Sequence, residues 1–235
     1  DNRFMEKTLT AGGAGGRGKI RPAEPVYGKG EDLFNAISHI VGGALGIAIL
    51  IALFIAASAN PTPNKYAAAG IYSLSIIILY TMSALYHFFP QGRAKRLFRI
   101  FDHCTIFLLI AGCYTPFCLI TFWGTPLGYA ILGVEWGLAV LGITFNAINM
   151  RWKAVKVLSM MAYVVMGWMI VPAVPMLLSS VSVACFAWLL AGGLSYTFGL
   201  IFFALGKNHA YMHCVWHIFV LAGTACQFIS IFMLM

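Results

Sequence analysis

The hydrophobic positions of the chain fall into seven long runs, each about long enough to cross the hydrocarbon core of a bilayer, which takes about 20 residues. Short polar breaks rich in Pro, Gly, Asn and Ser separate the runs, as expected for turns between helices. No run alternates apolar and polar residues as the strands of an outer-membrane barrel do. The pattern therefore predicts an all-α integral membrane protein, a seven-transmembrane helix bundle. The predicted spans lie near Ala36–Ser58, Tyr66–Phe89, Ile100–Phe122, Leu127–Ala147, Val155–Leu178, Val183–Leu205 and Tyr211–Met235.

The composition excludes a soluble globular protein. Of the 235 residues, 61% are hydrophobic and only 9% are charged, against about 25% charged residues in an ordinary soluble domain. A disordered chain is excluded for the same reason. The six cysteines are scattered through apolar stretches without a CxxC pair, so we expect buried thiols and no disulfide framework.

The N-terminal residues differ from the rest of the chain, because they are polar and rich in glycine. No apolar segment with a cleavage site follows promptly, so this stretch does not read as a secretory signal. We expect residues 1–30 to form a flexible cytosolic tail and residues 31–235 to form one membrane domain.

The basic residues indicate how the bundle is oriented. The net charge is +8, and fourteen of the fifteen Lys and Arg residues lie in the tail and in the second, fourth and sixth loops, whereas Lys65 alone lies in the first loop. The positive-inside rule then places the N-terminus in the cytoplasm and the C-terminus outside. We therefore expect a multi-pass protein of the plasma (inner) membrane with membrane lipids as partners, and no nucleic-acid partner.

Small residues and prolines predict where helices approach or bend. Pairs of small residues four apart let helix backbones come close, and prolines inside a span loosen it. The pairs are Gly42 with Gly46, Gly133 with Gly137, and Ser195 with Gly199. The prolines are Pro116, Pro172 and Pro175.

Ionisable side chains gather at one level of the predicted bundle. Such groups are costly inside a span, which makes each of them a candidate functional residue. All the histidines fall in the cytoplasmic half of the membrane although they come from four predicted helices. They are His39, His87, His103, His209, His213 and His217, and the acids near or within spans are Glu31, Asp32, Asp102 and Glu135.

The spacing of three histidines predicts a metal site. His213 and His217 are four residues apart, so they lie on one face of a helix about one turn from each other. His87 lies at matching depth on another predicted helix and is the natural third ligand. Three imidazoles that leave one position open are typical of catalytic Zn²⁺ sites, and zinc is the favoured metal for this donor set.

Two further side chains fit a hydrolytic role beside that metal. Zinc lowers the pKa of a bound water to about 7. Asp102 is the acid best placed to take a proton there as a general base. Ser83 lies one turn deeper than His87 on the same helix face, where its hydroxyl would hydrogen-bond the water or an oxyanion.

Other polar residues near this level have more than one interpretation. Glu31, Asn35 and His39 repeat every four residues and would form a polar seam that supports the metal ligands. Glu31 and Asp32 would equally serve as acids at a helix N-terminus. His103 and His209 are interpreted as hydrogen-bonding residues between helices or near a loop. Glu135 is assigned no role.

These motifs resemble the hemolysin III proteins of the progestin and adipoQ receptor (PAQR) superfamily. The resemblance is carried by Glu31-x-x-x-Asn35-x-x-x-His39, Ser83-x-x-x-His87, Phe101-Asp102-His103 with Ala111-Gly-Cys-Tyr-Thr-Pro116, and His213-x-x-x-His217. It implies a seven-helix bundle with a cytosolic N-terminus and a zinc ion held by His87, His213 and His217. It also implies that Asp102 contacts the metal-bound water, with Ser83 beside it.

The resemblance leaves several functions open. Similarity of the family to alkaline ceramidases suggests a metal-dependent intramembrane hydrolase of lipid amide or ester bonds. The alternative is a non-enzymatic sensor or regulator of membrane homeostasis in which zinc is structural. A pore-forming cytolysin is disfavoured, because the polar groups gather at one end of the spans rather than along them.

Overall fold

The computed structural model describes residues 27–235, and this part of the chain is built from helices and loops without a β-strand. Residues 1–26, most of the expected tail, lie outside the described part. The helices are α2 (Lys29–Ala59), α3 (Pro63–Phe88), α4 (Arg93–Pro116), α5 (Pro126–Asn149), α6 (Lys153–Gly167), α7 (Val174–Ser180), α8 (Val183–Leu205) and α9 (Met212–Phe232). A π-helical turn, η1 (Phe117–Thr121), follows α4, and a 3-10 turn, η2 (Val171–Ala173), joins α6 to α7.

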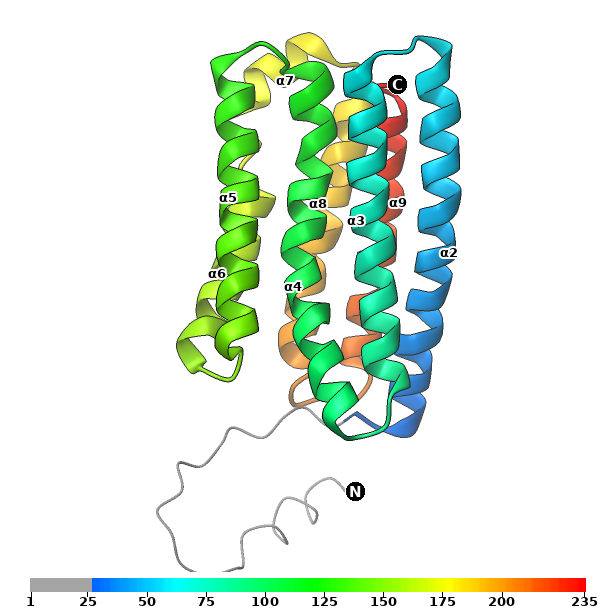
Figure 1. Cartoon of the computed structure of the whole chain (residues 1–235), viewed down its shortest axis with the longest axis vertical. Helices are drawn as coiled ribbons and strands as arrows, with labels where there is room; N and C mark the ends of the chain where they lie inside the picture. Colours follow the sequence, from blue (N-terminus) through cyan, green and yellow to red (C-terminus); the bar gives the residue numbers. More distant parts are fainter. Residues whose placement is uncertain (1–26) are drawn as a thin grey trace, which may run out of the picture.

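Seven segments of the described chain are long and apolar enough to cross a membrane, which confirms the predicted all-α, seven-helix bundle. Two of the seven are composite: α4 continues into η1, and α6, η2 and α7 together make the fifth. Successive spans run up and down (Figure 1), so α2, α4, α6 and α9 begin, and α3 ends, at the same end of the bundle.

Several helices start at residues suited to that position. Thr62, Thr125 and Ser182 each accept a hydrogen bond from the backbone N–H three residues later, which satisfies an otherwise unpaired donor at the helix start. A proline follows the first two of these caps at the first helical position, where its missing N–H costs nothing. These caps explain the sharp starts of α3, α5 and α8.

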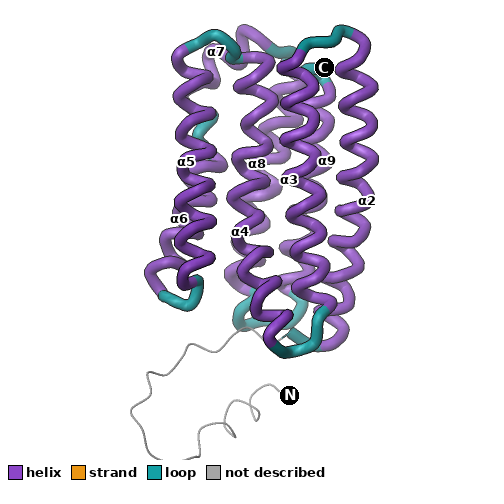
Figure 2. Tube along the Cα trace, in the orientation of Figure 1, coloured by secondary structure: helices purple, strands orange, loops and turns teal. Residues whose placement is uncertain are grey.

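The packing brings the first and last helices of the described chain together. α2 packs against α3 and also against α9, α3 packs against α4, and α8 packs against α9. α5 and α6 lie at one side of the bundle (Figures 1 and 2). Large apolar side chains on the outside are exposed, for example Ile55 at 69%, Ile148 at 71% and Val183 at 80%, as expected when lipid rather than water surrounds the helices.

The small-residue pairs lie at close helix contacts, as predicted, in two of three cases. A Cβ on Gly42 of α2 would lie 2.7 Å from the Tyr80 ring of α3, and one on Gly199 of α8 would lie 2.8 Å from Trp216 of α9. The prediction was wrong for Gly133 and Gly137, which have open space around them. Both lie on an exposed face of peripheral α5, so no helix approaches there.

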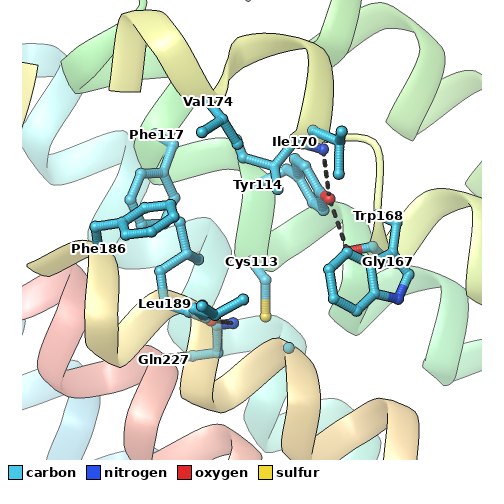
Figure 3. A pocket seen from close by; sticks show the side chains of 13 residues that line it. Cys113, Tyr114, Phe117, Gly167, Trp168, Ile170, Val174, Phe186, Leu189 and Gln227 are labelled. Atoms are coloured by element: carbon cyan, nitrogen blue, oxygen red, sulfur yellow. Dashed lines mark hydrogen bonds between the residues drawn. The ribbon is translucent and has the colours of Figure 1, made fainter. Parts of the chain in front are cut away.

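The prolines interrupt the helices as predicted. α4 changes to π-helical geometry directly after Pro116, and the span that contains Pro172 and Pro175 breaks between Gly167 and Val174. The Tyr114 hydroxyl donates to the Gly167 carbonyl at 3.0 Å and accepts from the Ile170 N–H at 3.0 Å. One side chain of α4 thus satisfies backbone groups that the break leaves free, as Figure 3 shows.

A mostly apolar cavity lies beside this break. The space inside it that water-sized molecules can occupy is about 90 Å³. It is lined by α4, α6 to α8 and α9, with Phe117, Val174, Phe186 and Leu189 on its walls (Figure 3). It shares no lining residue with the cavity at the histidines described below.

Candidate metal centre

Three histidines meet at one end of the bundle. His87 lies in the last turn of α3, and His213 and His217 lie in the first two turns of α9. One ligand atom from each lies within 4.8 Å of the others, and over residues 27–235 this is the one group of His, Cys, Asp or Glu with such geometry. The three side chains are buried, with exposed fractions of 2%, 4% and 1%. This buried triad could hold a metal ion.

The unsatisfied nitrogens of the triad fit a metal. His87 Nε2 and His213 Nε2 are buried without a hydrogen-bond partner in the described part of the chain. Leaving a buried polar atom unpaired costs about 1–3 kcal/mol. A cation that accepts the nitrogen lone pairs would remove this cost for both rings, and neutral imidazole is a common metal ligand.

The other ring nitrogen of His87 is held by a carboxylate. His87 Nδ1 lies 2.8 Å from Asp32 Oδ1, and Asp32 Oδ2 accepts a hydrogen bond from Lys95 Nζ at 2.8 Å. An ionised carboxylate only accepts hydrogen bonds, so His87 Nδ1 carries the proton. Nε2 is then the nitrogen left free for a metal, and it is buried without a hydrogen-bond partner among the described residues.

The same argument fixes the tautomer of His217. Its Nδ1 lies 3.2 Å from Ser38 Oγ, and that hydroxyl donates its own proton to the Asn35 carbonyl at 3.0 Å. Ser38 therefore accepts from His217 Nδ1–H, which leaves Nε2 of His217 for a metal. The His39 ring stacks on His217 with centroids 3.7 Å apart. Asn35 and His39, two of the expected supporting residues, thus lie beside the triad.

The predicted base and hydroxyl lie together beside the histidines. Ser83 and Asp102 line one cavity with His39, His213 and His217. The space for water-sized molecules is about 20 Å³, which is room for about one water molecule. The structure therefore places a carboxylate and a hydroxyl next to the open side of the triad.

Glu31, the remaining member of the expected seam, points elsewhere. Its Oε1 accepts from the Tyr211 N–H at 2.6 Å, and its Oε2 accepts from the Gly28 N–H at 2.7 Å. Neighbouring residues on a helix point about 100° apart, so when Asp32 faces His87, Glu31 faces the start of α9. Glu31 caps α2 and ties it to the α9 start, two residues before His213.

Tyr27 covers the triad and was not singled out by its sequence. Its ring stacks on His213 with centroids 4.7 Å apart and lies 5.4 Å from the His87 ring. Burial, with smaller contributions from nearby acidic groups, raises the pKa of the Tyr27 hydroxyl well above its usual value. The neutral phenol ring thus lies against two of the three histidines, at the start of α2.

The remaining ionisable residues lie apart from the triad. His103 Nδ1 lies 3.7 Å from Asp102 Oδ2, so this histidine borders the site without joining the ligands. His209 is exposed in the loop before α9. Glu135 is fully buried in α5, and its carboxylate oxygens have no hydrogen-bond partner among the described residues.

A comparison with protein families decides what kind of protein this is. The family described as "Haemolysin-III related" matches residues 27–228. The chain belongs to the hemolysin III family. The resemblance seen in the motifs is thereby confirmed, and the match spans every helix from α2 to α8 and most of α9.

Relatives of this hemolysin III protein occur in bacteria and animals. It is 41% identical to "Hemolysin-3" of Bacillus cereus over 201 residues, which cover 86% of this chain and 90% of the relative. It is 38% identical to "Hemolysin-3 homolog" of Bacillus subtilis (strain 168), with 86% and 92% covered. It is 25% identical to the human "Monocyte to macrophage differentiation factor" over 168 residues, with 69% and 68% covered.

Proposed function

We propose that this protein is a zinc-dependent hydrolase that cleaves amide or ester bonds of membrane lipids. The observation that carries the proposal is the shared cavity in which Asp102 and Ser83 face two of the three buried histidines. A structural metal site needs only its ligands. A carboxylate, a hydroxyl and space for about one water beside an open His triad are the parts that hydrolysis requires.

The side chains have distinct roles in this proposal. Zinc bound by His87, His213 and His217 would supply a water of lowered pKa and would polarise a carbonyl. Asp102 accepts the proton at a carboxylate oxygen and passes it on to the leaving amine or alcohol. Ser83, which lines the same cavity, donates to the carbonyl oxygen as negative charge develops on it.

The position of the site supports a lipid substrate. The cavity walls include the apolar side chains of Leu79, Ile106 and Trp216, so apolar groups border the candidate metal site. Nine of the ten Lys and Arg residues from Lys29 onward lie at the triad end of the bundle, and Lys65 lies at the other. By the positive-inside rule we expect the triad near the cytoplasmic surface of the plasma membrane, where lipid carbonyls lie.

Turnover by the purified protein in lipid vesicles tests the proposal. Ceramides, phospholipids and acyl amides are offered with zinc and after removal of zinc, and released fatty acid is measured. Asp102→Asn should fold and bind zinc but lose about 10²–10⁴-fold in rate, the usual contribution of a general base. Glu135→Gln, a change at a buried carboxyl outside the site, is the control. Absence of zinc-dependent product from every lipid class would refute the proposal.

A second candidate is a non-enzymatic membrane sensor with a structural metal. The stacked Tyr27 ring and the small cavity favour it, because both limit access to the metal. In that case Asp102→Asn leaves the biological function intact, whereas His87→Ala unfolds the protein. The opposite result, a folded and inactive Asp102→Asn protein, favours the hydrolase.

A further inference from the structure

Asp32 and Lys95 lie outside the predicted site, yet they hold one of its ligands. Asp32 of α2 bridges the His87 ring of α3 and the Lys95 ammonium of α4, with both contacts at 2.8 Å. We propose that Asp32 and Lys95 form a positioning pair that fixes the His87 ring for metal binding. The inference rests on the metal-binding part of the proposed function and not on hydrolysis.

Asp32 acts on the side chain of His87. An imidazole ring can rotate and can carry its proton on either nitrogen. The Asp32 carboxylate removes both freedoms, because only Nδ1–H satisfies it and only one ring orientation reaches it. A carboxylate on the far nitrogen also makes a histidine a more basic metal ligand. Asp32 therefore preorganises Nε2 toward His213 and His217.

Lys95 acts on both Asp32 and the backbone around His87. Its Nζ donates to Asp32 Oδ2 and to the carbonyl oxygens of Phe89 at 3.2 Å and His87 at 3.5 Å. These carbonyls end α3 and have no partner within the helix. One ammonium thus joins the carboxylate that holds the ring to the backbone that carries it, and α2, α3 and α4 are linked at one point.

The burial of Lys95 supports a specific role. Lysine is almost never fully buried unless it is paired, and Lys95 is 3% exposed whereas its neighbour Arg96 is exposed. A buried ion pair by itself is weak evidence for stability, since desolvation offsets the attraction. What the arrangement does provide is a fixed direction for the His87 ring.

Metal affinity measured without turnover tests the pair. The full chain in detergent is stripped of metal and titrated with zinc and with cobalt, whose absorption spectrum reports ligand geometry. Asp32→Asn keeps an acceptor but loses the charge, and Asp32→Leu loses both. Lys95→Met removes the bridge, and Arg96→Met removes one positive charge at the next, exposed position as a matched control. Nitrogen-15 spectra of labelled histidine report which ring nitrogen carries the proton.

The expected result is a graded loss of affinity. Asp32→Asn and Lys95→Met should bind zinc about 10–100-fold more weakly, the usual effect of removing a partner of a metal-bound histidine. Asp32→Leu should lose more zinc affinity, and its nitrogen-15 spectrum should show one histidine no longer held in the Nδ1–H form. Arg96→Met should bind zinc as tightly as the unaltered protein. If Asp32→Leu does not fold, the zinc affinities of Asp32→Asn and Lys95→Met still test the inference.

Three results would overturn the inference. They are unchanged affinity in both Asp32→Asn and Lys95→Met, an equal loss in Arg96→Met, and no zinc binding by the unaltered protein. The last result also refutes the proposed hydrolase. Tight zinc binding without lipid turnover refutes the hydrolase alone and leaves the positioning pair in place, so the two failures are distinguishable.

Discussion

At the scale of single residues, Thr224 shows how polar side chains are accommodated inside the bundle. Its hydroxyl lies 2.7 Å from the Tyr80 hydroxyl of α3 and 2.9 Å from the Tyr196 hydroxyl of α8. Tyr80 and Thr224 are buried and Tyr196 is partly buried, and an unpaired buried hydroxyl is costly. One threonine of α9 therefore links three helices through hydrogen bonds.

Replacing Thr224 should lower stability more than a threonine replacement usually does. Thr224→Val keeps the shape but leaves the Tyr80 and Tyr196 hydroxyls without this partner, which we expect to cost about 1–3 kcal/mol. Thermal unfolding in detergent measures the effect. Thr144→Val is the matched control, because that exposed hydroxyl bonds only its own helix. Equal melting temperatures for the two variants would contradict the prediction.

Tyr27 carries a second prediction at this scale. Tyr27→Ala removes the ring stacked on His213, and such ring contacts contribute about 0.5–1.5 kcal/mol. We expect zinc to leave the variant about 2–12-fold faster, the factor to which that energy corresponds. The measurement is the rate of transfer to an excess of a water-soluble chelator. Tyr129→Ala, at an exposed ring of α5, should leave the rate unchanged.

The residue scale also shows what the sequence reveals about the site. The spacing of His213 and His217 and the depth of His87 suffice to predict the triad, because helix geometry is regular. The choice between Glu31 and Asp32 is not predictable in this way, since both lie in the first turn of α2 and the rotation of that helix depends on packing. Asn35 is four residues from Glu31 and three from Asp32, and both spacings lie on one helix face, so spacing does not decide between the two acids.

At the scale of helices, the contact between α2 and α3 depends on the absence of a side chain at Gly42. An added Cβ would lie within 2.8 Å of several carbons of the buried Tyr80 ring. We expect Gly42→Ala to cost about 1–3 kcal/mol through overpacking. Gly133→Ala, where the space is open, should be neutral or stabilising by up to about 1 kcal/mol, since alanine favours helix. Denaturant unfolding compares the two, and similar losses in both would contradict the prediction.

The first and last residues of a helix were predictable only where the apolar run and the helix begin and end at the same residues. The span predicted from Val183 to Leu205 matches α8, whereas α2 and α4 begin at Lys29 and Arg93, well before the predicted Ala36 and Ile100. Both helices continue past the apolar run into charged turns, because helical hydrogen bonds do not require lipid. An apolar pattern marks the membrane-embedded part of a helix and not its full length.

At the scale of the whole molecule, the distribution of charge predicts the orientation in the membrane. Lys65 is the one basic residue from Lys29 onward at the end opposite the triad. We expect Lys65→Cys to react with a membrane-impermeant maleimide on intact cells, and Lys153→Cys to react only after the membrane is opened. The unaltered protein controls for the native cysteines, five of which are buried. The reverse labelling pattern would contradict the prediction and indicate the opposite orientation in the membrane.

The order of the helices has a consequence for how the protein is made. The triad takes one residue from α3 and two from α9, so its ligands are separated by the synthesis of α4 to α8. The triad cannot form on the growing chain until α9, which packs against α2 and α8, has joined the bundle. A complete triad is therefore a property of the finished bundle, and a chain interrupted before α9 would lack two of the three histidines.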